Sequence, residues 1–304
     1  MTVSDQGLPS VGFIGVGAIG RPMAERMLRH FPLTICDSDV AARSHFVGKA
    51  PFVSSARELA EVADIVFACL PSLESYRAVV LAPGGLSAGG RMRFFIHVGT
   101  TGTELVRDID AALVDRGVGM LDAPVSGGAP RAWLGDLMVM ASGRRDIFEL
   151  VEPMIRCYAS SLIYLGATPG LAQTMKLINN VLSAANLAVA AEVLTFGAKV
   201  GLDPAQMLEV LNGGTGQNSA TLTKIPHHIL PRTFDYGGRL QIVVKDLAMC
   251  VSEADRMGLH LPFSELIAAT YRAAIAQEGP NADMTTVIRQ MERAAGVEVV
   301  AATP

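Results

Sequence analysis

The 304-residue sequence lacks the features of several protein classes. Only 18% of its residues are charged, its formal charge is −4, and it has no run of five or more Lys or Arg residues. We therefore expect neither nucleic acid nor a membrane surface as a partner. The four cysteines have no CxxC spacing and the six histidines form no HExxH pattern. This predicts reduced, buried cysteines in a cytoplasmic protein and no metal site.

No targeting segment is expected at the start of the sequence. Residues 1–10 are polar and short of basic side chains, which predicts that they are not a signal peptide. The long apolar stretch between Lys176 and Lys199 is interrupted by Asn179, Asn180, Asn186 and Glu192. A buried helix of a soluble protein is therefore predicted, and not a membrane span.

The first half alternates strand-like and helix-like runs, a pattern typical of a parallel sheet covered on both faces. Strands are predicted at residues 11–15, 33–36, 64–69, 94–98, 120–123, 137–141 and 162–165. Helices are predicted at residues 18–29, 55–61 and 103–116.

After Gly170 the remaining runs are all helical. They are predicted at residues 176–199, 204–213, 243–257, 262–279 and 283–295, with Asp203 and Pro204 starting the second one. The predicted fold is an α/β Rossmann-type dinucleotide-binding domain, residues 1–170, followed by an all-α domain, residues 171–304. We expect the second domain to open with a long interdomain helix and to serve substrate binding and oligomerisation.

A glycine-rich loop follows the first predicted strand directly. Its sequence from Gly15 through Gly17, Ala18 and Ile19 to Gly20 is GxGxxG at the start of a helix. Glycines allow a tight turn and let backbone N–H groups approach a pyrophosphate, and the helix N-terminus attracts its charge. The loop therefore predicts a dinucleotide site, with a plain structural turn as the alternative.

Asp37 ends the second predicted strand, where a carboxylate can bind the hydroxyls of the adenosine ribose. A carboxylate repels a 2′-phosphate, and Ser38 and Asp39 follow it instead of an Arg. NAD is therefore predicted over NADP. Arg43 could still fold back toward this position, so NADP remains the second choice.

The long helix carries polar side chains on one face. Lys176, Asn180 and Ser183 have the spacing i, i+4, i+7 and so share that face. A buried cation needs partners. The alternatives from this pattern are a structural ion pair and a face that surrounds a ligand.

Five motifs together resemble the β-hydroxyacid dehydrogenases, the 3-hydroxyisobutyrate dehydrogenase-like enzymes, over nearly the whole chain. They are GFIGVGAIGRPMA at 12–24, CLPS at 69–72, DAPVSGG at 122–128, GxxxxxKxxNN at 170–180 and KDL at 245–247. The resemblance implies reversible hydride transfer between a nicotinamide and C3 of a small 3-hydroxy acid, or reduction of the matching semialdehyde.

The resemblance also assigns catalytic roles on the long helix. It implies that Lys176 transfers the proton to and from the substrate oxygen, with a pKa lowered by burial. Asn180, one turn further on, is expected to hold the hydroxyl or orient the lysine. Asn179 points elsewhere and is expected to play a supporting role.

The remaining assignments concern binding. The resemblance implies that Ser126, Gly127 and Gly128 hold the substrate carboxylate, with a tight turn between strands as the alternative. It further implies contacts to the cofactor from Leu70, Pro71, Thr100 and Lys245, of which Lys245 also touches substrate. Asp246 either pairs with Lys245 or caps a helix. Phe234 is expected in the core, and Trp133 either packs on the substrate loop or covers the sheet.

Several positions depart from the family pattern. His97 and Gly99 stand where an acid and a Ser are usual, Ala172 replaces a glycine, and GDL at 135–137 replaces GTL. These differences suggest a substrate other than that of the valine-pathway enzyme, such as tartronate semialdehyde or a serine-like or phenylserine-like acid. The alternatives are an imine reductase-like enzyme, against which Lys176 argues, and a non-catalytic dinucleotide-binding module. Broad apolar faces predict a homodimer or homotetramer.

Overall fold

The computed structural model describes residues 9–301. The contacts divide the chain into two compact units, with the division between Lys176 and Leu177. The division falls inside a long helix and not ahead of it. The expectation about a signal peptide concerns residues 1–10 and lies almost entirely outside the described residues.

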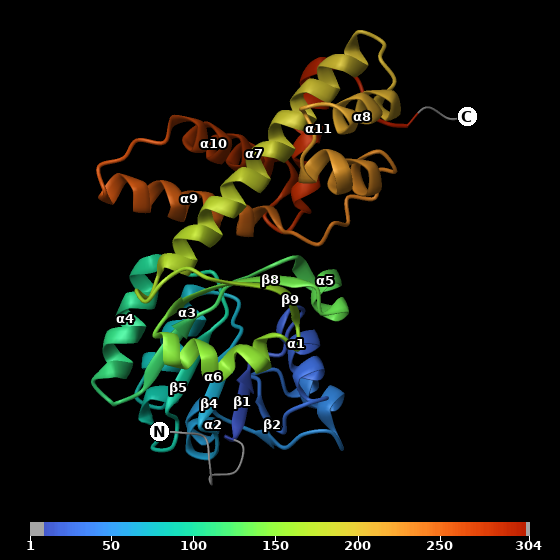
Figure 1. Cartoon of the computed structure of the whole chain (residues 1–304). Helices are drawn as coiled ribbons and strands as arrows, with labels where there is room; N and C mark the ends of the chain where they lie inside the picture. The colour runs from blue at the N-terminus through green and yellow to red at the C-terminus, as the bar shows by residue number, and fades with distance from the viewer. Residues whose placement is uncertain (1–8, 302–304) are drawn as a thin grey trace. The chain divides into compact units, whose positions relative to one another are not determined.

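The first unit contains a nine-stranded sheet in the order β3-β2-β1-β4-β5-β6-β8-β7, with β9 also paired to β8 (Figure 1). The strands are β1 Val11–Ile14, β2 Leu33–Cys36, β3 Phe52–Val53, β4 Ile65–Ala68, β5 Phe94–His97, β6 Gly119–Asp122, β7 Val125–Ser126, β8 Leu137–Gly143 and β9 Ala159–Tyr164. Strands β1 to β6 pair in parallel, which confirms the Rossmann-type domain.

Two parts of the sheet differ from the sequence prediction. The strands β3 and β7 are only two residues long, too short to show a periodic pattern. Strand β8 runs antiparallel to β6 and β7. Strand β9 is parallel to β8, so both strands run opposite to β1 to β6, and the expectation of a parallel extension is wrong for both.

Helices cover both faces of this sheet, because apolar side chains along its strands point alternately to the two faces. Phe13 and Phe67 belong to the apolar cluster that includes α1 and α6, while Ile14 and Val66 belong to the cluster of α2 and α4. The helices of the unit are α1 Gly20–Met27, α2 Ala56–Val62, α3 Leu73–Tyr76, α4 Gly102–Val114, α5 Gly128–Leu134 and α6 Arg145–Ile155, with short helical turns η1 Val40–Phe46, η2 Arg77–Leu81 and η3 Leu86–Ala88. The apolar side chains of the two clusters leave water on folding, and this burial is the main contribution to the stability of the unit.

The second unit is helical, as predicted. After α7 (Leu171–Lys199), which starts in the first unit, its elements are α8 Pro204–Gly213, η4 Ala220–Ile229, α9 Leu240–Arg256, α10 Pro262–Glu278, η5 Met284–Val287 and α11 Ile288–Ala295. The π-helix η4 was not predicted. Its interior proline, Pro226, hides a helical pattern from sequence reasoning.

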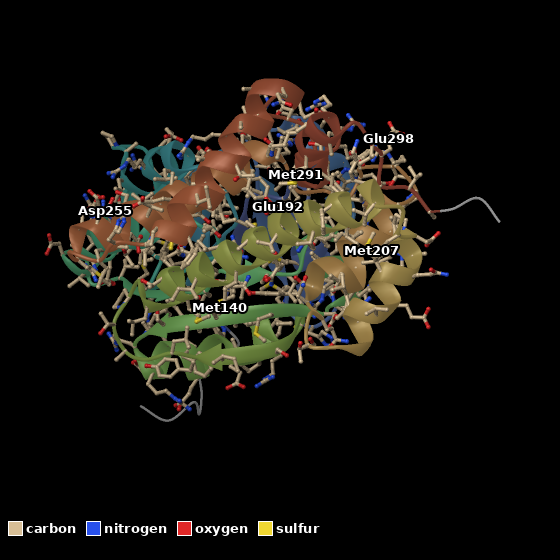
Figure 2. All side chains as sticks on the ribbon, turned by 90° about the horizontal axis from the view of Figure 1, so that it is seen from above. Met140, Glu192, Met207, Asp255, Met291 and Glu298 are labelled. Atoms are coloured by element: carbon tan, nitrogen blue, oxygen red, sulfur yellow. The ribbon has the colours of Figure 1, made fainter. Side chains whose placement is uncertain are left out.

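Helix α7 is the central element of the second unit. Leu187, Ala191 and Leu194 are buried in its core. Gly197 lets α8 approach closely, because a Cβ there would collide with the sulfur of Met207, which is labelled in Figure 2. By length and composition α7 could cross a membrane, but 44% of its most apolar window is buried inside the protein. It is therefore not a clear membrane span.

The four cysteines are free. Cys36 is buried as predicted, whereas Cys69, Cys157 and Cys250 are only half-buried, so the expectation of burial is wrong for these three. Burial raises the pKa of Cys36 to about 11 and that of Cys69 to about 12. A raised pKa keeps both thiols protonated and unreactive near neutral pH.

Candidate functional site

The glycine loop has one glycine open to a ligand and two that the fold itself requires. Gly15 has φ +88°, and a Cβ there would collide with the carbonyl oxygen of Cys69. A Cβ at Gly20 would collide with the carbonyl oxygen of Gly15. A Cβ at Gly17, by contrast, would meet nothing within 4 Å. The backbone at Gly17 is thus bare at the mouth of the loop, as a bound pyrophosphate requires.

Asp37 lies beside this loop at the end of β2. Its Oδ2 accepts a hydrogen bond from Val16 N at 2.6 Å, and its Oδ1 accepts one from Asp39 N at 2.8 Å. Arg43 does not reach it, because the guanidinium of Arg43 lies over the ring of Phe52 at 5.8 Å. A carboxylate fixed next to an open glycine and the N-terminus of α1 fits the adenosine half of a dinucleotide.

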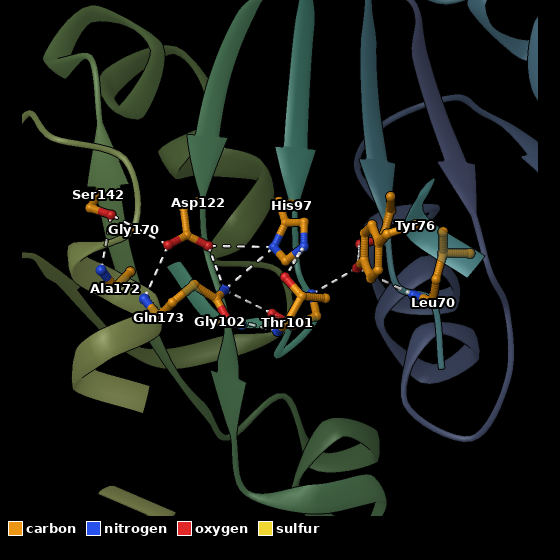
Figure 3. Close-up of polar contacts among 12 residues, drawn as sticks. Leu70, Tyr76, His97, Thr101, Gly102, Asp122, Ser142, Gly170, Ala172 and Gln173 are labelled. Carbon is orange, nitrogen blue, oxygen red and sulfur yellow. Dashed lines mark hydrogen bonds and ion pairs between the residues drawn. The ribbon is translucent and has the colours of Figure 1, made fainter. Parts of the chain in front are cut away.

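The segments after β4 and β5 are fastened to each other by Tyr76 (Figure 3). Its buried hydroxyl donates to Ala68 O at 2.7 Å and accepts from Leu70 N at 3.3 Å and from Gly99 N at 2.8 Å. Leu70 and Thr100, two residues expected at the cofactor, are therefore positioned by one phenol; Pro71 follows Leu70 directly. Burial raises the pKa of Tyr76, so the hydroxyl keeps its proton for donation.

Gln173 connects the first turn of α7 to the ends of β5 and β6. Its Oε1 accepts from Thr101 N at 2.9 Å and Gly102 N at 3.1 Å, which caps the N-terminus of α4. Its Nε2 donates to Gly99 O at 3.0 Å and to Asp122 Oδ1 at 2.7 Å (Figure 3). Gln173 is fully buried. It holds Lys176, three residues further along the same helix, in a fixed relation to this edge of the sheet.

The N-terminus of α7 is capped by two side chains of the sheet. Asp122 Oδ2 accepts from Gln173 N at 3.1 Å, and Ser142 Oγ accepts from Ala172 N at 3.0 Å. A carboxylate at this end also interacts favourably with the helix dipole. These caps explain why α7 begins at Leu171, ahead of the predicted start at Lys176. Asp122, in the DAPVSGG motif, thus stabilises the N-terminus of the helix that carries Lys176.

His97, one of the departures from the family pattern, is fully buried in the same network. Its Nε2 lies 3.1 Å from Thr101 Oγ1, and its Nδ1 lies 3.4 Å from Asp122 Oδ1. Its ring packs against that of Tyr76 with 4.2 Å between centroids. The imidazole therefore supports the loop that carries Thr100.

Ser126, Gly127 and Gly128 lie where β7 ends and α5 begins. Gly127 and Gly128 have φ +137° and +72°, values that favour glycine. Helix α5 has no side-chain cap, and a Cβ at Gly128 would meet only Pro130, at 3.8 Å. The backbone at Gly128 is thus little obstructed, which suits a carboxylate, whereas a Cβ at Gly127 would lie 3.0 Å from Leu137. Trp133, which is 44% exposed in α5, has Arg21 over its ring.

Lys176 is buried on α7, with 8% of its surface exposed. Asn180 follows one turn later, and its Nδ2 donates to Asp246 Oδ2 at 2.6 Å. Its Oδ1 accepts from Asn179 Nδ2 at 3.2 Å. Asp246 also makes an ion pair with Lys245. The Nζ of Lys245 lies 3.0 Å from Oδ1 of Asp246, but the angles at this contact are not those of a hydrogen bond. Asp246 lies inside α9 and does not cap it, so of the two alternatives the pairing is the observed one.

The structure thus gathers several of the predicted residues in two groups. The glycine loop, Asp37 and the ends of β4 and β5 lie at the carboxyl edge of the first unit's parallel strands. In the second unit, Asp246 brings Asn180 and Lys245 together. Sequence reasoning missed Tyr76, Gln173 and Lys224, which is described below. Phe234, expected in the core, packs partly buried against it, and its ring contacts the guanidiniums of Arg232 and Arg289.

Comparison with known proteins agrees with this arrangement. The family model described as the NAD binding domain of 6-phosphogluconate dehydrogenase matches residues 10–166, and that described as NAD-binding of NADP-dependent 3-hydroxyisobutyrate dehydrogenase matches residues 170–291. The 2-(hydroxymethyl)glutarate dehydrogenase of Eubacterium barkeri is 28% identical, with 95% of this chain and 97% of that protein aligned. The mitochondrial 3-hydroxyisobutyrate dehydrogenase of Mus musculus is 30% identical over 92% of this chain and 86% of its own length. The structure of Mycobacterium tuberculosis 3-hydroxyisobutyrate dehydrogenase with L-serine has a TM-score of 0.84 at 26% identity, with 93% of this chain and 99% of that chain covered.

Proposed function

The chain belongs to the β-hydroxyacid dehydrogenase family, and we propose that it transfers a hydride between NAD and C3 of a small 3-hydroxy acid, with Lys176 as the proton-transfer group. The observation that carries this proposal is the Gln173 network. It fixes the turn of α7 that holds Lys176 to the segments that carry Thr100 and Asp122. The reverse reaction, reduction of the matching semialdehyde, uses the same groups.

In the oxidation direction the substrate loses its hydroxyl proton and the hydride on C3. The nicotinamide, when bound, supplies the acceptor for the hydride. Lys176, in its neutral form, takes the hydroxyl proton as the carbonyl forms, and its ammonium returns that proton in the reduction. The positive charge also stabilises the alkoxide-like transition state.

The other residues of the proposed site bind and orient. The hydroxyl of Ser126 and the backbone N–H groups of Gly127 and Gly128 hold the substrate carboxylate. Asn180 binds the reacting oxygen or orients Lys176, and Asp246 fixes its amide by the 2.6 Å hydrogen bond. Lys245, held by the same carboxylate, contacts substrate or cofactor.

For the cofactor we propose NAD over NADP. Gly15, Gly17, Ala18, Ile19 and Gly20 form the pyrophosphate loop, and Asp37 binds the ribose. The support is electrostatic, since a 2′-phosphate would meet the Asp37 carboxylate while Arg43 is engaged with Phe52. Leu70, Pro71 and Thr100 complete the proposed contacts to the cofactor.

The candidate substrates are several small 3-hydroxy acids. The names of the aligned proteins point to 3-hydroxyisobutyrate and 2-(hydroxymethyl)glutarate. A panel of 3-hydroxy acids and their semialdehydes, assayed in parallel with NAD and NADP, tests the proposal. We expect NAD-linked turnover of at least one acid; a clear preference for NADP would contradict the interpretation of Asp37, and no turnover with either cofactor would contradict the enzyme.

We also propose a cytoplasmic homodimer or homotetramer. Apolar side chains exposed on α7 recur at alternating spacings of four and three residues over much of its length, as on helices that pack against one another. They are Leu171, Met175, Ile178, Leu182, Val189, Val193 and Phe196. Light scattering of the purified protein, and of a Leu182→Glu variant expected to have a lower mass, tests this assembly.

A further inference from the structure

The π-helix η4 (Ala220–Ile229) turns one lysine inward. Pro226 has no N–H, so the carbonyl of Thr221, five residues earlier, lacks its π-helical donor and instead accepts from Asn212 Nδ2 at 3.1 Å. Leu230 N donates to Ile225 O, again five residues apart, at 2.9 Å. The wider turn of a π-helix brings side chains i and i+5 near each other on one side. Ser219 and Lys224 are such a pair.

Lys224 is 2% exposed, and its ammonium is surrounded by neutral groups. Its Nζ donates to Ser183 Oγ at 2.9 Å and lies 3.5 Å from Ser219 Oγ. The ring of Tyr236 lies 5.4 Å from Nζ, which places the cation over an aromatic face. Among the described residues, no carboxylate pairs with Lys224, unlike Lys245 with its Asp246. The structure thus has a buried cation without a counter-charge.

This arrangement costs free energy, since a buried charge is stable only when it is paired or well hydrogen-bonded. Desolvation lowers the pKa of Lys224 to about 8 and no neighbouring charge opposes the shift. At neutral pH the group is still mostly protonated. An anion arriving at Nζ would supply the missing charge and raise the pKa again.

The ammonium is also within reach of a ligand. Ser183 is half-buried and Ser219 is exposed, so the two hydroxyls that contact Nζ connect it to solvent. Ser183 lies on the face of α7 that carries Asn180 and Lys176, three and seven residues earlier. At 1.5 Å per residue, Ser183 is about 10 Å along the helix axis from Lys176. A substrate held at Lys176 that extends along this face toward Ser183 would end near Lys224.

We propose that Lys224, Ser183 and Ser219 form a subsite for a second carboxylate on the substrate, distal to the reacting hydroxyl. The proposal rests on the proposed function in placing the reacting carbon at Lys176. It makes the preferred substrate a 3-hydroxy acid that is also a dicarboxylate. The hydroxyls of Ser183 and Ser219 donate to the distal carboxylate, and Lys224 supplies its counter-charge through a charge-assisted hydrogen bond.

The test compares 3-hydroxyisobutyrate with two acids in which its methyl group is replaced by CH2COO⁻ or CH2CH2COO⁻. Each is measured for kcat/KM with NAD, and for binding by calorimetry in the presence of NAD, using the wild-type chain and Lys224→Met. We expect at least one diacid to exceed 3-hydroxyisobutyrate, and Lys224→Met to lower the diacid values about 10- to 100-fold while changing those of the monoacid less than about threefold. Lys199→Met, which removes an exposed lysine of the same unit, should change neither.

The outcomes separate the two proposals. If the monoacid is oxidised but neither diacid depends on Lys224, the subsite is refuted and the dehydrogenase stands. If no acid is oxidised but the calorimetric preference for a diacid disappears in Lys224→Met, the subsite stands and the dehydrogenase falls. If Lys224→Met does not fold, Ser183→Ala, which keeps the cation and removes one donor, serves in its place and should weaken diacid binding selectively.

Discussion

The hydroxyl of Tyr76 fills the space that a side chain at Gly99 would need. A Cβ on residue 99 would lie 2.6 Å from the hydroxyl oxygen, and the same oxygen accepts a hydrogen bond from Gly99 N at 2.8 Å. The phenol therefore anchors the start of the loop that carries Thr100. The departure from a serine at position 99 thus has a structural reason, since this chain uses a tyrosine from another segment.

Replacing either member of this pair should disturb the cofactor side of the site. Tyr76→Phe leaves Gly99 N without its acceptor and removes one of the two donors to Ala68 O, which keeps its bond from Val98 N, and should lower the free energy of unfolding by about 1–3 kcal/mol. Gly99→Ser forces the phenol to move and should raise the KM for NAD. Urea unfolding and steady-state kinetics measure the two effects. Arg239→Ala, a change at an exposed residue of the second unit, serves as control and should alter neither.

Replacement of Gln173 should lower both stability and kcat, although Gln173 takes no part in the proposed reaction. Gln173→Leu removes the acceptor of Thr101 N and Gly102 N and a donor to the buried Asp122, so we expect a loss of about 2–4 kcal/mol in unfolding free energy. Because Lys176 is three residues away on the same helix, kcat should fall more than the affinity for NAD. An unchanged kcat in a folded Gln173→Leu protein would show that the network does not position Lys176.

Asp37 should control the choice of cofactor. Asp37→Ser removes the carboxylate that opposes a 2′-phosphate, so the ratio of kcat/KM for NAD to that for NADP should fall about 10-fold or more. Asp39→Ser is the matched control, because its carboxylate caps η1 through Ala41 N and lies further along the chain. Equal ratios in both variants would contradict the assignment of Asp37.

Lys224 should make stability depend on pH with a defined sign. Its pKa is about 8 in the folded protein and 10.5 in the unfolded chain. Between these values the unfolded chain binds more protons, so this group makes the free energy of unfolding rise with pH. The Lys224→Met variant has no such group. The free energy of unfolding of the variant minus that of the wild type should therefore decrease by about 2–3 kcal/mol from pH 7 to pH 10.

The difference between the two proteins is measured by urea unfolding at each pH. The groups that face Nζ are the hydroxyls of Ser183 and Ser219 and the ring of Tyr236. Of these only Tyr236 has an ionisable side chain, so the comparison is repeated in a Tyr236→Phe background. A difference that is independent of pH would mean that Lys224 is not desolvated.

The sequence predicts the elements that carry a strong local signal. Strand β2 is found where its apolar run predicts it, and α8 begins at Pro204 after Asp203, whose side chain caps it. The glycine loop could be recognised because its residues are neighbours in the chain. Residues that act across the fold could not. In the sequence Gln173 is an ordinary helical residue. Its role depends on Asp122 and Gly102, which are far away in the sequence and lie beside it only in the folded chain.

The same limit applies to Lys224 and η4. A proline inside a helical run normally predicts a break, but Pro226 lies inside the π-helix η4. Whether a lysine on such a segment faces solvent or the core depends on that turn. The pairing of Asp246 with Lys245, left open by the sequence, likewise follows from the position of Asp246 within α9.

The central claim, proton transfer by Lys176, is tested most directly by Lys176→Ala assayed on the acid that the wild type oxidises fastest. NADH binding, followed by fluorescence titration, should be unchanged within about twofold, because the glycine loop and Asp37 are untouched. We expect kcat to fall by about 10²- to 10⁴-fold, the contribution typical of a positioned acid–base group. Unchanged turnover with intact NADH binding would contradict the role of Lys176.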